Sequence, residues 1–415
     1  MIDLRLGDCL DILPTLPSDS IDTIITDPPY GLEFMGKDWD HGVPGVPFWN
    51  AALRVAKPGA IMLAFGGTRT HHRLMCAIED AGWEIRDCLM WLYGSGFPKS
   101  HDISKAIDKA AGAEREVVGE YASHRPNTEA HENGKYSGEL HTNGKLTAPA
   151  TDAAATWDGW GTALKPAWEP IILAMKPRDG TFANNALTHG VAGLWIDGGR
   201  IGYVNGDGPE NLRRVDGPNS APRTNGCYAQ DEWTKTKFKR NCPQGHSQGR
   251  WPANLILDEA AAAMLGEQSG EAGQRVKGGY VQKAPVMGTN TFNSGVPYTD
   301  NRVGRAPLDA PGTAARFFYC AKASRAERTC NGTVDNKHPT VKPVALLKYL
   351  LRLTRTPTGG KVLDLFMGSG SMGVACVDED RDFVGIEKDP GEFNTAQCRI
   401  KHARGQVRQP ALEGV

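Results

Sequence analysis

The chain has 415 residues but no hydrophobic run that approaches the roughly 20 residues a membrane-spanning helix needs. Its amino terminus has no signal-peptide pattern, and no internal repeat is evident. None of the nine cysteines forms a Cys-x-x-Cys pair, so we expect reduced thiols rather than disulfides. Cys227, Cys242 and His246 lack the paired spacing of zinc ligands, so we expect no metal. These absences favour a cytoplasmic protein without a membrane partner.

Net charge is also small: it is −1 at pH 7, which by itself argues against a nucleic-acid partner. The charges are unevenly placed, however, because residues 311–361 carry ten lysines and arginines against two acidic residues. A second basic region interleaves cations with aromatic rings, and its candidate contacts are Lys235, Lys237, Lys239, Arg240 and Arg250. Such mixtures suit phosphate contacts with ring stacking. A solvated surface loop is the alternative interpretation.

Two apolar runs far apart in the sequence both end in turn-forming residues. The run 21–26 ends at Asp27-Pro28-Pro29-Tyr30, and the run 362–365 ends at the glycine-rich segment 366–370. Both runs are rich in β-branched or aliphatic residues, which predicts two buried parallel strands. Loops that follow such strands lie at the carboxyl edge of the sheet, where open α/β sheets bind ligands. The sequence therefore predicts an α/β fold with two ligand loops.

The tetrapeptide Asp27-Pro28-Pro29-Tyr30 is stiff because each proline fixes its own φ and favours extended geometry in the residue before it. The stiff loop presents the Asp27 carboxylate, the Pro28 carbonyl and the Tyr30 ring in fixed positions. An exocyclic amino group on a purine or pyrimidine needs two such acceptors and a stacking face. A tight turn with a surface aspartate is the structural alternative.

The segment 366–370 leads into a predicted helix that starts at Ser371, an arrangement that lets the backbone approach a nucleoside-containing ligand closely. The next predicted strand, residues 383–386, ends at Glu387. An acidic residue at that place can accept hydrogen bonds from ribose hydroxyls. Taken alone, this strand, glycine-rich turn and helix fit a site for NAD, FAD or S-adenosylmethionine. A glycine turn that binds no ligand is the alternative.

Together these motifs resemble the amino-group DNA methyltransferases, whose catalytic tetrapeptide is Asp/Asn/Ser-Pro-Pro-Tyr/Phe/Trp and whose cofactor loop is Phe-x-Gly-x-Gly. Here the catalytic motif comes first, an order similar to the permuted β class of that family. Gly7-Asp8-Cys9-Leu10 is similar to the segment whose aspartate contacts the cofactor adenine. Residues 338–343 are similar to the segment that lies against the cofactor methionine. Further segments resemble bacterial and phage members: 57–59, 162–170, 249–254 and 317–328.

The resemblance implies a permuted, Rossmann-like, S-adenosylmethionine-dependent methyltransferase fold with an inserted irregular target-recognition region. The implied catalytic residues are Asp27, Pro28, Pro29 and Tyr30. The implied cofactor-binding residues are Asp8, Lys342, Asp364, Phe366, Gly368, Ser369, Gly370 and Glu387. The chain departs from the family pattern in having Leu365 in place of proline and Ser371 and Met372 in place of threonine. The glycines on whose backbone the loop depends are kept, so we expect cofactor binding to be retained.

We expect residues 1–175 to form the catalytic half of the methyltransferase domain, residues 311–400 the cofactor half, and residues 401–415 a tail. Residues 111–160 show little periodicity, which predicts a mobile loop that orders over DNA. Residues 176–310 are rich in Gly, Pro and Asn, which predicts the target-recognition insertion. Helices are expected at 102–111 and 258–265.

The expected reaction moves a methyl group from S-adenosylmethionine to the N6 amino group of an adenine flipped out of double-stranded DNA. Asp27 at the first motif position favours adenine within the family, while the acceptor pattern also permits N4 of cytosine. RNA and protein amino-group methyltransferases usually have the opposite motif order. A non-catalytic DNA-binding relative is expected to lack Asp27 or a loop glycine. The resemblance also permits a homodimer and a cognate restriction enzyme as partners.

Overall fold

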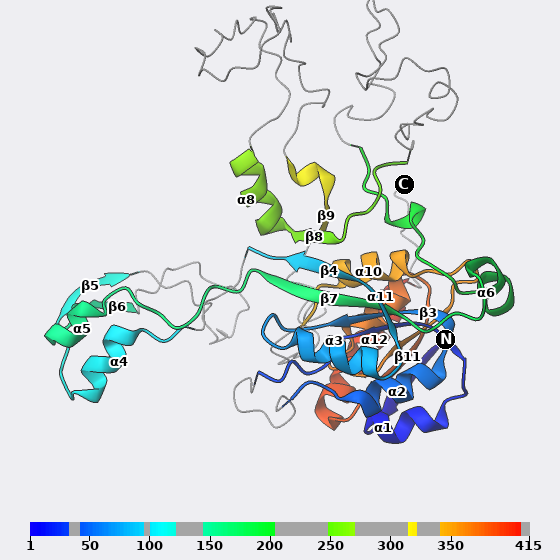
Figure 1. The fold of residues 1–415 in the computed structure, drawn as a ribbon, viewed down its shortest axis with the longest axis horizontal. Helices are drawn as coiled ribbons and strands as arrows, with labels where there is room; N and C mark the ends of the chain where they lie inside the picture. The colour runs from blue at the N-terminus through cyan, green and yellow to red at the C-terminus, as the bar shows by residue number, and fades with distance from the viewer. Residues whose placement is uncertain are drawn as a thin grey trace, which may run out of the picture. The chain divides into compact units, whose positions relative to one another are not determined.

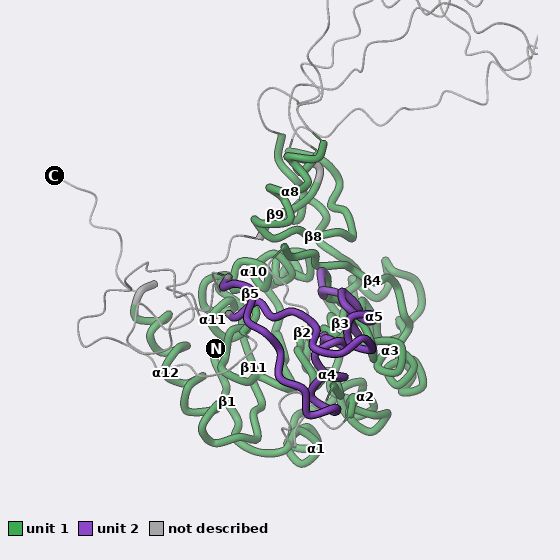
Figure 2. The backbone as a smooth tube through the Cα atoms, turned by 90° about the vertical axis from the view of Figure 1, so that its left-hand side faces the viewer, with its two compact units in different colours: residues 1–94, 168–415 green, residues 95–167 purple. Residues whose placement is uncertain are grey.

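The computed structural model describes residues 1–32, 42–94, 100–121, 144–203, 248–269, 314–321 and 341–407. The chain divides into two compact units, one formed by residues 1–94 and 168–415 and the other by residues 95–167 (Figure 2). Both predicted ligand loops belong to the larger unit.

Within the described residues, one sheet of nine strands runs through the larger unit (Figure 1). The strands are β1 (Ile2–Leu6), β2 (Ile21–Thr26), β3 (Ala56–Phe65), β4 (Glu84–Leu92), β7 (Trp168–Met175), β8 (Leu255–Asp258), β9 (Tyr319–Ala321), β10 (Lys361–Asp364) and β11 (Asp382–Glu387). Their spatial order is β1-β11-β10-β2-β3-β7-β4-β8-β9. Strand β7 is antiparallel to its neighbours β3 and β4, and the other neighbouring pairs are parallel. The predicted α/β class is therefore confirmed.

The strand order reverses between β10 and β2. From β10 the chain passes through α11 (Ser371–Asp378) to β11 on one side, and from β2 it passes through α2 (Val46–Val55) to β3 on the other. Such a switch point, at the carboxyl ends of the strands, is where open α/β sheets bind ligands. The arrangement is Rossmann-like, and it is permuted because β2 precedes β10 in the chain.

The central strands are buried on both faces, as their apolar sequences predict. All six residues of β2 are buried. Successive residues of β3 alternate between two hydrophobic clusters: Ile61, Leu63 and Phe65 belong to one, Met62 and Ala64 to the other. This two-residue period follows from strand geometry, and the two clusters are the cores on opposite faces of the sheet.

Helices α10 (Val344–Leu353), α11 and α12 (Pro390–Val407) contribute to the first of these clusters. Helices α1 (Cys9–Ile12), α2 and α3 (His71–Asp80) contribute to the second. The remaining short elements of the larger unit are η1 (Leu13–Thr15), α6 (Phe182–His189), η4 (Asp197–Gly199), α8 (Glu259–Ser269) and η5 (Ala314–Phe317). Because α11 begins directly after the glycine-rich loop, its packing in the first cluster fixes where that loop lies.

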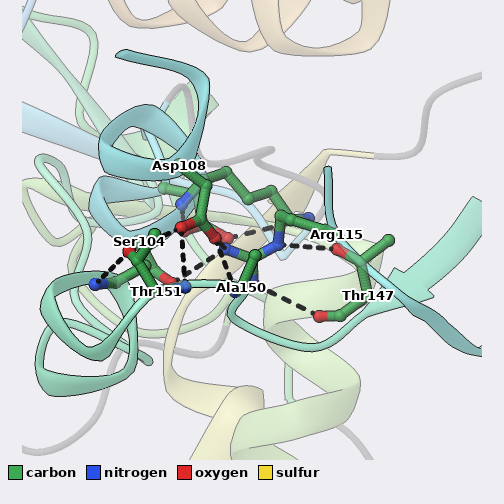
Figure 3. Close-up of polar contacts among 9 residues, drawn as sticks. Ser104, Asp108, Arg115, Thr147, Ala150 and Thr151 are labelled. Carbon is green, nitrogen blue, oxygen red and sulfur yellow. Dashed lines mark hydrogen bonds and ion pairs between the residues drawn. The ribbon is translucent and has the colours of Figure 1, made fainter. Parts of the chain in front are cut away.

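The smaller unit has a polar centre of its own (Figure 3). It contains α4 (Ile103–Ala110), α5 (Asp152–Thr156) and a two-stranded antiparallel sheet of β5 (Val117–Tyr121) and β6 (Gly144–Thr147). The buried Asp108 carboxylate pairs with Arg115 at 2.6 Å and accepts from the Thr151 hydroxyl at 2.8 Å. Burial acts to raise the pKa of Asp108, but the Ala150 N–H, Thr151 and Arg115 outweigh it and lower that pKa.

The structure differs from the sequence expectation in this unit. The helix expected at 102–111 is confirmed as α4, but β5, β6 and α5 fall within the segment 111–160, which was expected to be a loop. Residues 122–143 lie outside the described residues.

Part of the expected insertion at 176–310 belongs to the main sheet. Strand β8 pairs in parallel with β4, and the expected helix at 258–265 is confirmed as α8. The pairing of β8 is a long-range contact that the composition of this region does not reveal. Residues 204–247 and 270–310 lie outside the described residues, so the rest of the insertion stays a prediction. In the part of the chain that the structure describes, no helix is long and apolar enough to span a membrane.

Candidate functional site

The two predicted ligand loops leave neighbouring strands of the sheet, because β2 and β10 pair in parallel. The strand ends are joined by a hydrogen bond of 2.7 Å from the Thr26 hydroxyl to Oδ1 of Asp364, two residues that are 338 positions apart. Asp27 follows Thr26 directly, and Phe366 lies two residues after Asp364. The structure therefore brings the tetrapeptide and the glycine-rich loop together at the switch point, as the sequence predicts.

Asp27, Tyr30 and Lys342 form one hydrogen-bonded group. The Tyr30 hydroxyl donates to Oδ1 of Asp27 over 2.9 Å, and the Lys342 ammonium donates to Oδ2 of Asp27 over 2.6 Å. The same ammonium donates to the Tyr30 oxygen over 3.1 Å and lies 5.0 Å from the centre of the Phe65 ring. Lys342, which the family resemblance predicts to lie beside the cofactor, contacts the tetrapeptide directly.

Glu169 completes this group, although no motif in the sequence indicated it. Its Oε2 atom lies 3.0 Å from the Tyr30 hydroxyl and 3.4 Å from the Lys342 ammonium. Glu169 is the second residue of β7, whose antiparallel direction puts its first residues beside the carboxyl end of β3. The segment 162–170 carried a family resemblance, but nothing local indicated the direction of the strand that follows.

The carboxylates set the protonation states of their neighbours. Burial acts to lower the pKa of Lys342, but Asp27 and Glu169 outweigh burial and hold that pKa above its usual value. Burial, followed by the negative charges of Asp27 and Glu169, raises the pKa of Tyr30 well above its usual value. Near neutral pH the group therefore contains a protonated lysine and a neutral tyrosine.

The loop after β3 supports the backbone of Tyr30. The Thr70 hydroxyl donates to the Tyr30 carbonyl over 2.6 Å. A Cβ atom on Gly67 would lie 3.3 Å from the Tyr30 Cβ, so the absence of a side chain at Gly67 lets the two loops approach closely. Pro28 is buried, whereas Asp27, Pro29 and Tyr30 are half-buried.

The glycine-rich loop turns sharply beside the end of β11. Gly368 and Gly370 have φ values of 52° and 81°, in the left-handed region that favours glycine. The Gly368 N–H donates to Oε2 of Glu387 over 2.8 Å, and the other Glu387 oxygen accepts from the Asp389 N–H over 2.8 Å. Because each carboxylate oxygen can accept a second hydrogen bond, Glu387 retains acceptor capacity at the loop.

The other predicted cofactor residues lie at the same edge of the sheet as this loop. Asp8 caps α1 by accepting from the Leu10 N–H over 2.9 Å. Phe366 is half-buried, and its ring centre lies 6.0 Å from that of Phe48. Since β1, β11 and β10 are consecutive in the sheet, Asp8, Glu387 and Asp364 lie at or just beyond the carboxyl ends of three adjacent strands. The structure thus gathers the predicted acceptors at the edge of the sheet where the glycine-rich loop lies.

Asp364 carries an unusual charge state. Burial raises the pKa of its carboxyl group to about 7, although hydrogen bonds from the Thr26 hydroxyl and the Phe366 N–H act to lower it. The negative charges of Asp27 and Glu387 also raise it. Asp364 therefore titrates near neutral pH.

Arg399 of α12 is a further buried residue that the sequence did not indicate. Its side chain is fully buried and donates to the Ser369 carbonyl over 2.7 Å. It also donates to the hydroxyls of Ser369 and Ser371, each over 3.0 Å. The polar atoms of Ser369 therefore hold the loop to α12. No local signal in the sequence of α12 distinguishes Arg399 from a surface arginine.

Four of the five predicted DNA contacts, Lys235, Lys237, Lys239 and Arg240, lie outside the described residues, as do Cys227, Cys242 and His246. The fifth, Arg250, exchanges backbone hydrogen bonds with Ile201, and its guanidinium lies 4.9 Å from the centre of the Tyr203 ring.

The fold and the site define a class of protein: permuted, Rossmann-like α/β proteins in which an Asp-Pro-Pro-Tyr loop lies beside a glycine-rich loop. The chain belongs to the N6_N4_Mtase family, described as DNA methylase, whose family model matches residues 21–397. This match confirms the family that the motifs indicated. The cofactor of this family is S-adenosylmethionine, which confirms the cofactor expected from the sequence.

Curated relatives match over shorter stretches. Type II methyltransferase M.BglI of Bacillus subtilis is 45% identical over 60 residues, which are 14% of this chain and 16% of that protein. Type II methyltransferase M.HindIII of Haemophilus influenzae is 24% identical over 242 residues, covering 47% of this chain and 65% of that protein. The chain thus matches less than two thirds of the length of either relative. Among solved structures, PvuII DNA methyltransferase (cytosine-N4-specific) is 12% identical, with a TM-score of 0.42 over 98% of this chain and 92% of that one. That similarity is too low to support an argument about function.

Proposed function

We propose that this protein is a site-specific DNA methyltransferase that moves the methyl group of S-adenosylmethionine to the N6 amino group of adenine. The observation that carries the proposal is the position of Asp27 and Tyr30 at the end of β2, directly beside the glycine-rich loop after β10. Two hydrogen-bond acceptors and a stacking ring are thereby placed next to acceptors suited to a nucleoside.

The predicted cofactor residues fit S-adenosylmethionine. Glu387 retains acceptor capacity for ribose hydroxyls, Asp8 offers a carboxylate to the adenine, and Gly368 has no side chain to obstruct the loop backbone. At Gly370 the absent side chain instead makes room for Ala396 of α12. When bound, the cofactor supplies an electrophilic methyl group on a sulfonium. Asp364, with Phe366 and Ser369, would form the floor of this site.

The tetrapeptide would orient the target base, which must be flipped out of the duplex to reach it. Tyr30 stacks on the base, and the Asp27 carboxylate and the Pro28 carbonyl accept its two amino hydrogens. These hydrogen bonds draw the amino nitrogen out of conjugation with the ring, so its lone pair can form the new N–C bond. Alignment is the main contribution, with one amino proton passing to Asp27 as the bond forms. No covalent enzyme intermediate is required.

Adenine is the proposed target because Asp27 occupies the first motif position, which by family resemblance goes mostly with adenine. The alternative is N4 of cytosine, which the same two acceptors could bind. A substrate of RNA or protein, or a non-catalytic DNA-binding role, is less well supported: the catalytic motif precedes the cofactor motif, and Asp27 and both loop glycines are present. Four further features stay predictions from the sequence: the target-recognition role of residues 176–310, a homodimer, a cognate restriction enzyme and a cytoplasmic location.

The proposal is tested by incubating the purified protein with unmethylated DNA and S-adenosylmethionine, digesting the DNA to nucleosides and measuring methylated bases by mass spectrometry. N6-methyladenine is the expected product. If the product were N4-methylcytosine, the proposed mechanism would stand and the target base would be cytosine instead of adenine. No methylated base on any DNA, with S-adenosylmethionine binding intact, would overturn the proposal.

A further inference from the structure

The ammonium group of Lys342 has three acceptors within reach. They are Oδ2 of Asp27 at 2.6 Å, the Tyr30 oxygen at 3.1 Å and Oε2 of Glu169 at 3.4 Å. A lysine ammonium has three hydrogens to donate, so these contacts account for all of them. The Lys342 side chain is only 9% exposed, so it depends on these partners rather than on water.

Tyr30 has two acceptors for a single proton. Its hydroxyl lies 2.9 Å from Oδ1 of Asp27 and 3.0 Å from Oε2 of Glu169. A neutral phenol donates one hydrogen bond, so the hydroxyl can bond to only one of the two carboxylates at a time. The geometry is close to equal for both choices, and Glu169 can therefore replace Asp27 as the acceptor without any large movement of Tyr30.

Both oxygens of Asp27 are thus engaged by residues of the protein itself. Under the proposed function, the amino group of the target base must also bind this carboxylate. Each Asp27 oxygen can accept a second hydrogen bond, but an amino group that binds there shares the carboxylate with the Lys342 ammonium and the Tyr30 hydroxyl and so weakens both contacts. A buried ammonium whose contact with its carboxylate is weakened is destabilised unless a second anion lies nearby, and Glu169 is such an anion.

We propose, on the basis of the proposed function, that Glu169 is a positioning residue that takes over the Lys342 ammonium and the Tyr30 hydroxyl when the target amino group binds Asp27. Lys342 then stays paired, and Asp27 is released for the base. In the transfer the amino nitrogen forms its bond to the methyl carbon, and the electron pair of the broken S–C bond stays on sulfur. One amino proton moves to Asp27, which becomes neutral, and Glu169 is then the remaining anionic partner of Lys342.

Two substitutions at Glu169 separate charge from shape. Glu169→Gln keeps the length of the side chain and an oxygen acceptor for Tyr30 but removes the negative charge. Glu169→Asp keeps the charge and shortens the side chain by one carbon. If Glu169 acts by pairing with Lys342, the aspartate variant should retain more activity than the glutamine variant. If Glu169 only fills space, the order should be reversed.

Glu84 provides the matched control. It lies at the opposite end of the β4–β7 pair, where it is opposite Met175, whereas Glu169 is opposite Trp91. The Glu84 side chain is 42% exposed and pairs only loosely with Arg86, at 3.5 Å. Glu84→Gln therefore makes the same chemical change in the same sheet, away from the tetrapeptide.

The experiment measures the single-turnover rate of methyl transfer to unmethylated plasmid DNA at saturating DNA and S-adenosylmethionine. We expect Glu169→Gln to lower the rate on the order of 10²-fold while the Kd for S-adenosylmethionine changes by less than about twofold. Glu169→Asp should lie between this variant and the wild type, and Glu84→Gln should match the wild type. A glutamine variant as fast as the wild type, or faster than the aspartate variant, would overturn the role of Glu169 and leave the proposed function intact. Absence of transfer in the wild-type and Glu84→Gln proteins would overturn both.

Discussion

The Lys342 ammonium lies 2.6 Å from Oδ2 of Asp27, although 315 positions separate the two residues. Asp27 directly follows β2 and begins the Pro-Pro-Tyr tetrapeptide, and Lys342 lies two residues before α10, ahead of the strand that precedes the glycine-rich loop. One ion pair therefore joins the two halves of the permuted domain at the switch point of the sheet. The geometry of the candidate site depends on both halves folding together.

Removing the Asp27 carboxylate should prevent methyl transfer. We expect Asp27→Ala to lower the transfer rate about 10²- to 10⁴-fold, the usual contribution of a group that accepts a proton at the reacting atom. Binding of S-adenosylmethionine, measured by calorimetry, should be unchanged because the proposed mechanism assigns Asp27 to the target base. The control is Asp197→Ala, which removes an exposed aspartate paired with Arg200. Normal turnover by Asp27→Ala would remove Asp27 from the mechanism.

A side chain on the glycine-rich loop should interfere with the cofactor. Gly368→Val adds a β-branched side chain at a φ of 52°, and we expect the affinity for S-adenosylmethionine to fall by at least about tenfold. Gly190→Val is the matched control, because Gly190 has a φ of 72° but nothing within 4 Å of an added Cβ. Both variants should lose stability through backbone strain, and only the first should lose cofactor affinity. If calorimetric titration gave the two variants equal affinities for S-adenosylmethionine, Gly368 would have no role in cofactor binding.

The raised pKa of Asp364 predicts that the difference in stability between the wild type and an Asp364→Asn variant depends on pH. In the folded protein this carboxyl titrates at about 7 instead of the ordinary value of 3.8. The contribution of Asp364 to the free energy of unfolding is therefore most favourable below pH 4 and is lost as the pH rises from about 4 to 7. Asp364→Asn cannot ionise and keeps an oxygen for the Thr26 hydroxyl. The variant should gain stability relative to the wild type across this pH range, by up to about 4 kcal/mol at pH 8.

Chemical denaturation of both proteins at pH 4, 6 and 8 measures this difference. A constant difference at all three pH values would show that Asp364 does not titrate as described.

The smaller unit should loosen when its central carboxylate is neutralised. Asp108→Asn removes the ion pair with Arg115 at 2.6 Å and leaves that guanidinium without its charged partner in the network of Figure 3. Hydrogen exchange followed by mass spectrometry should become faster in peptides from residues 100–121 and 144–167. Peptides from the larger unit, such as those covering β2 and β10, should exchange as before. Equal acceleration in both units would contradict the independence of the smaller unit's centre.

The basic stretch predicted from the sequence can be tested through salt dependence. Replacing Lys237, Lys239 and Arg240 together by alanine should weaken DNA binding and reduce the slope of log K against log salt by about 2.7, or about 0.9 for each lost phosphate contact. Binding of S-adenosylmethionine should not change. An unaltered slope in a fluorescence-anisotropy titration would favour the solvated-loop interpretation of this stretch.

Much of the central fold follows from local sequence. The apolar runs at 21–26 and 362–365 predicted β2 and β10, and their turn residues predicted where each strand ends. The expected helices at α4 and α8 were also found, with ends within a few residues of the prediction. In contrast, β5 and β6 are short, and β6 begins with a glycine, so the composition of residues 111–160 indicated a loop.

The sequence by itself determined which chemical groups the chain offers and in what order: the stiff Asp27-Pro28-Pro29-Tyr30 loop, the glycine-rich turn and the acid at Glu387. These features depend on residue type and on spacing along the chain, which the sequence states directly. Only the tertiary structure decided which side chains share the site. Glu169 reaches Tyr30 and Lys342 because β7 runs antiparallel, and Arg399 reaches Ser369 because α12 packs on the loop. Such contacts arise from strand direction and helix packing between residues distant in sequence, and no local pattern encodes either.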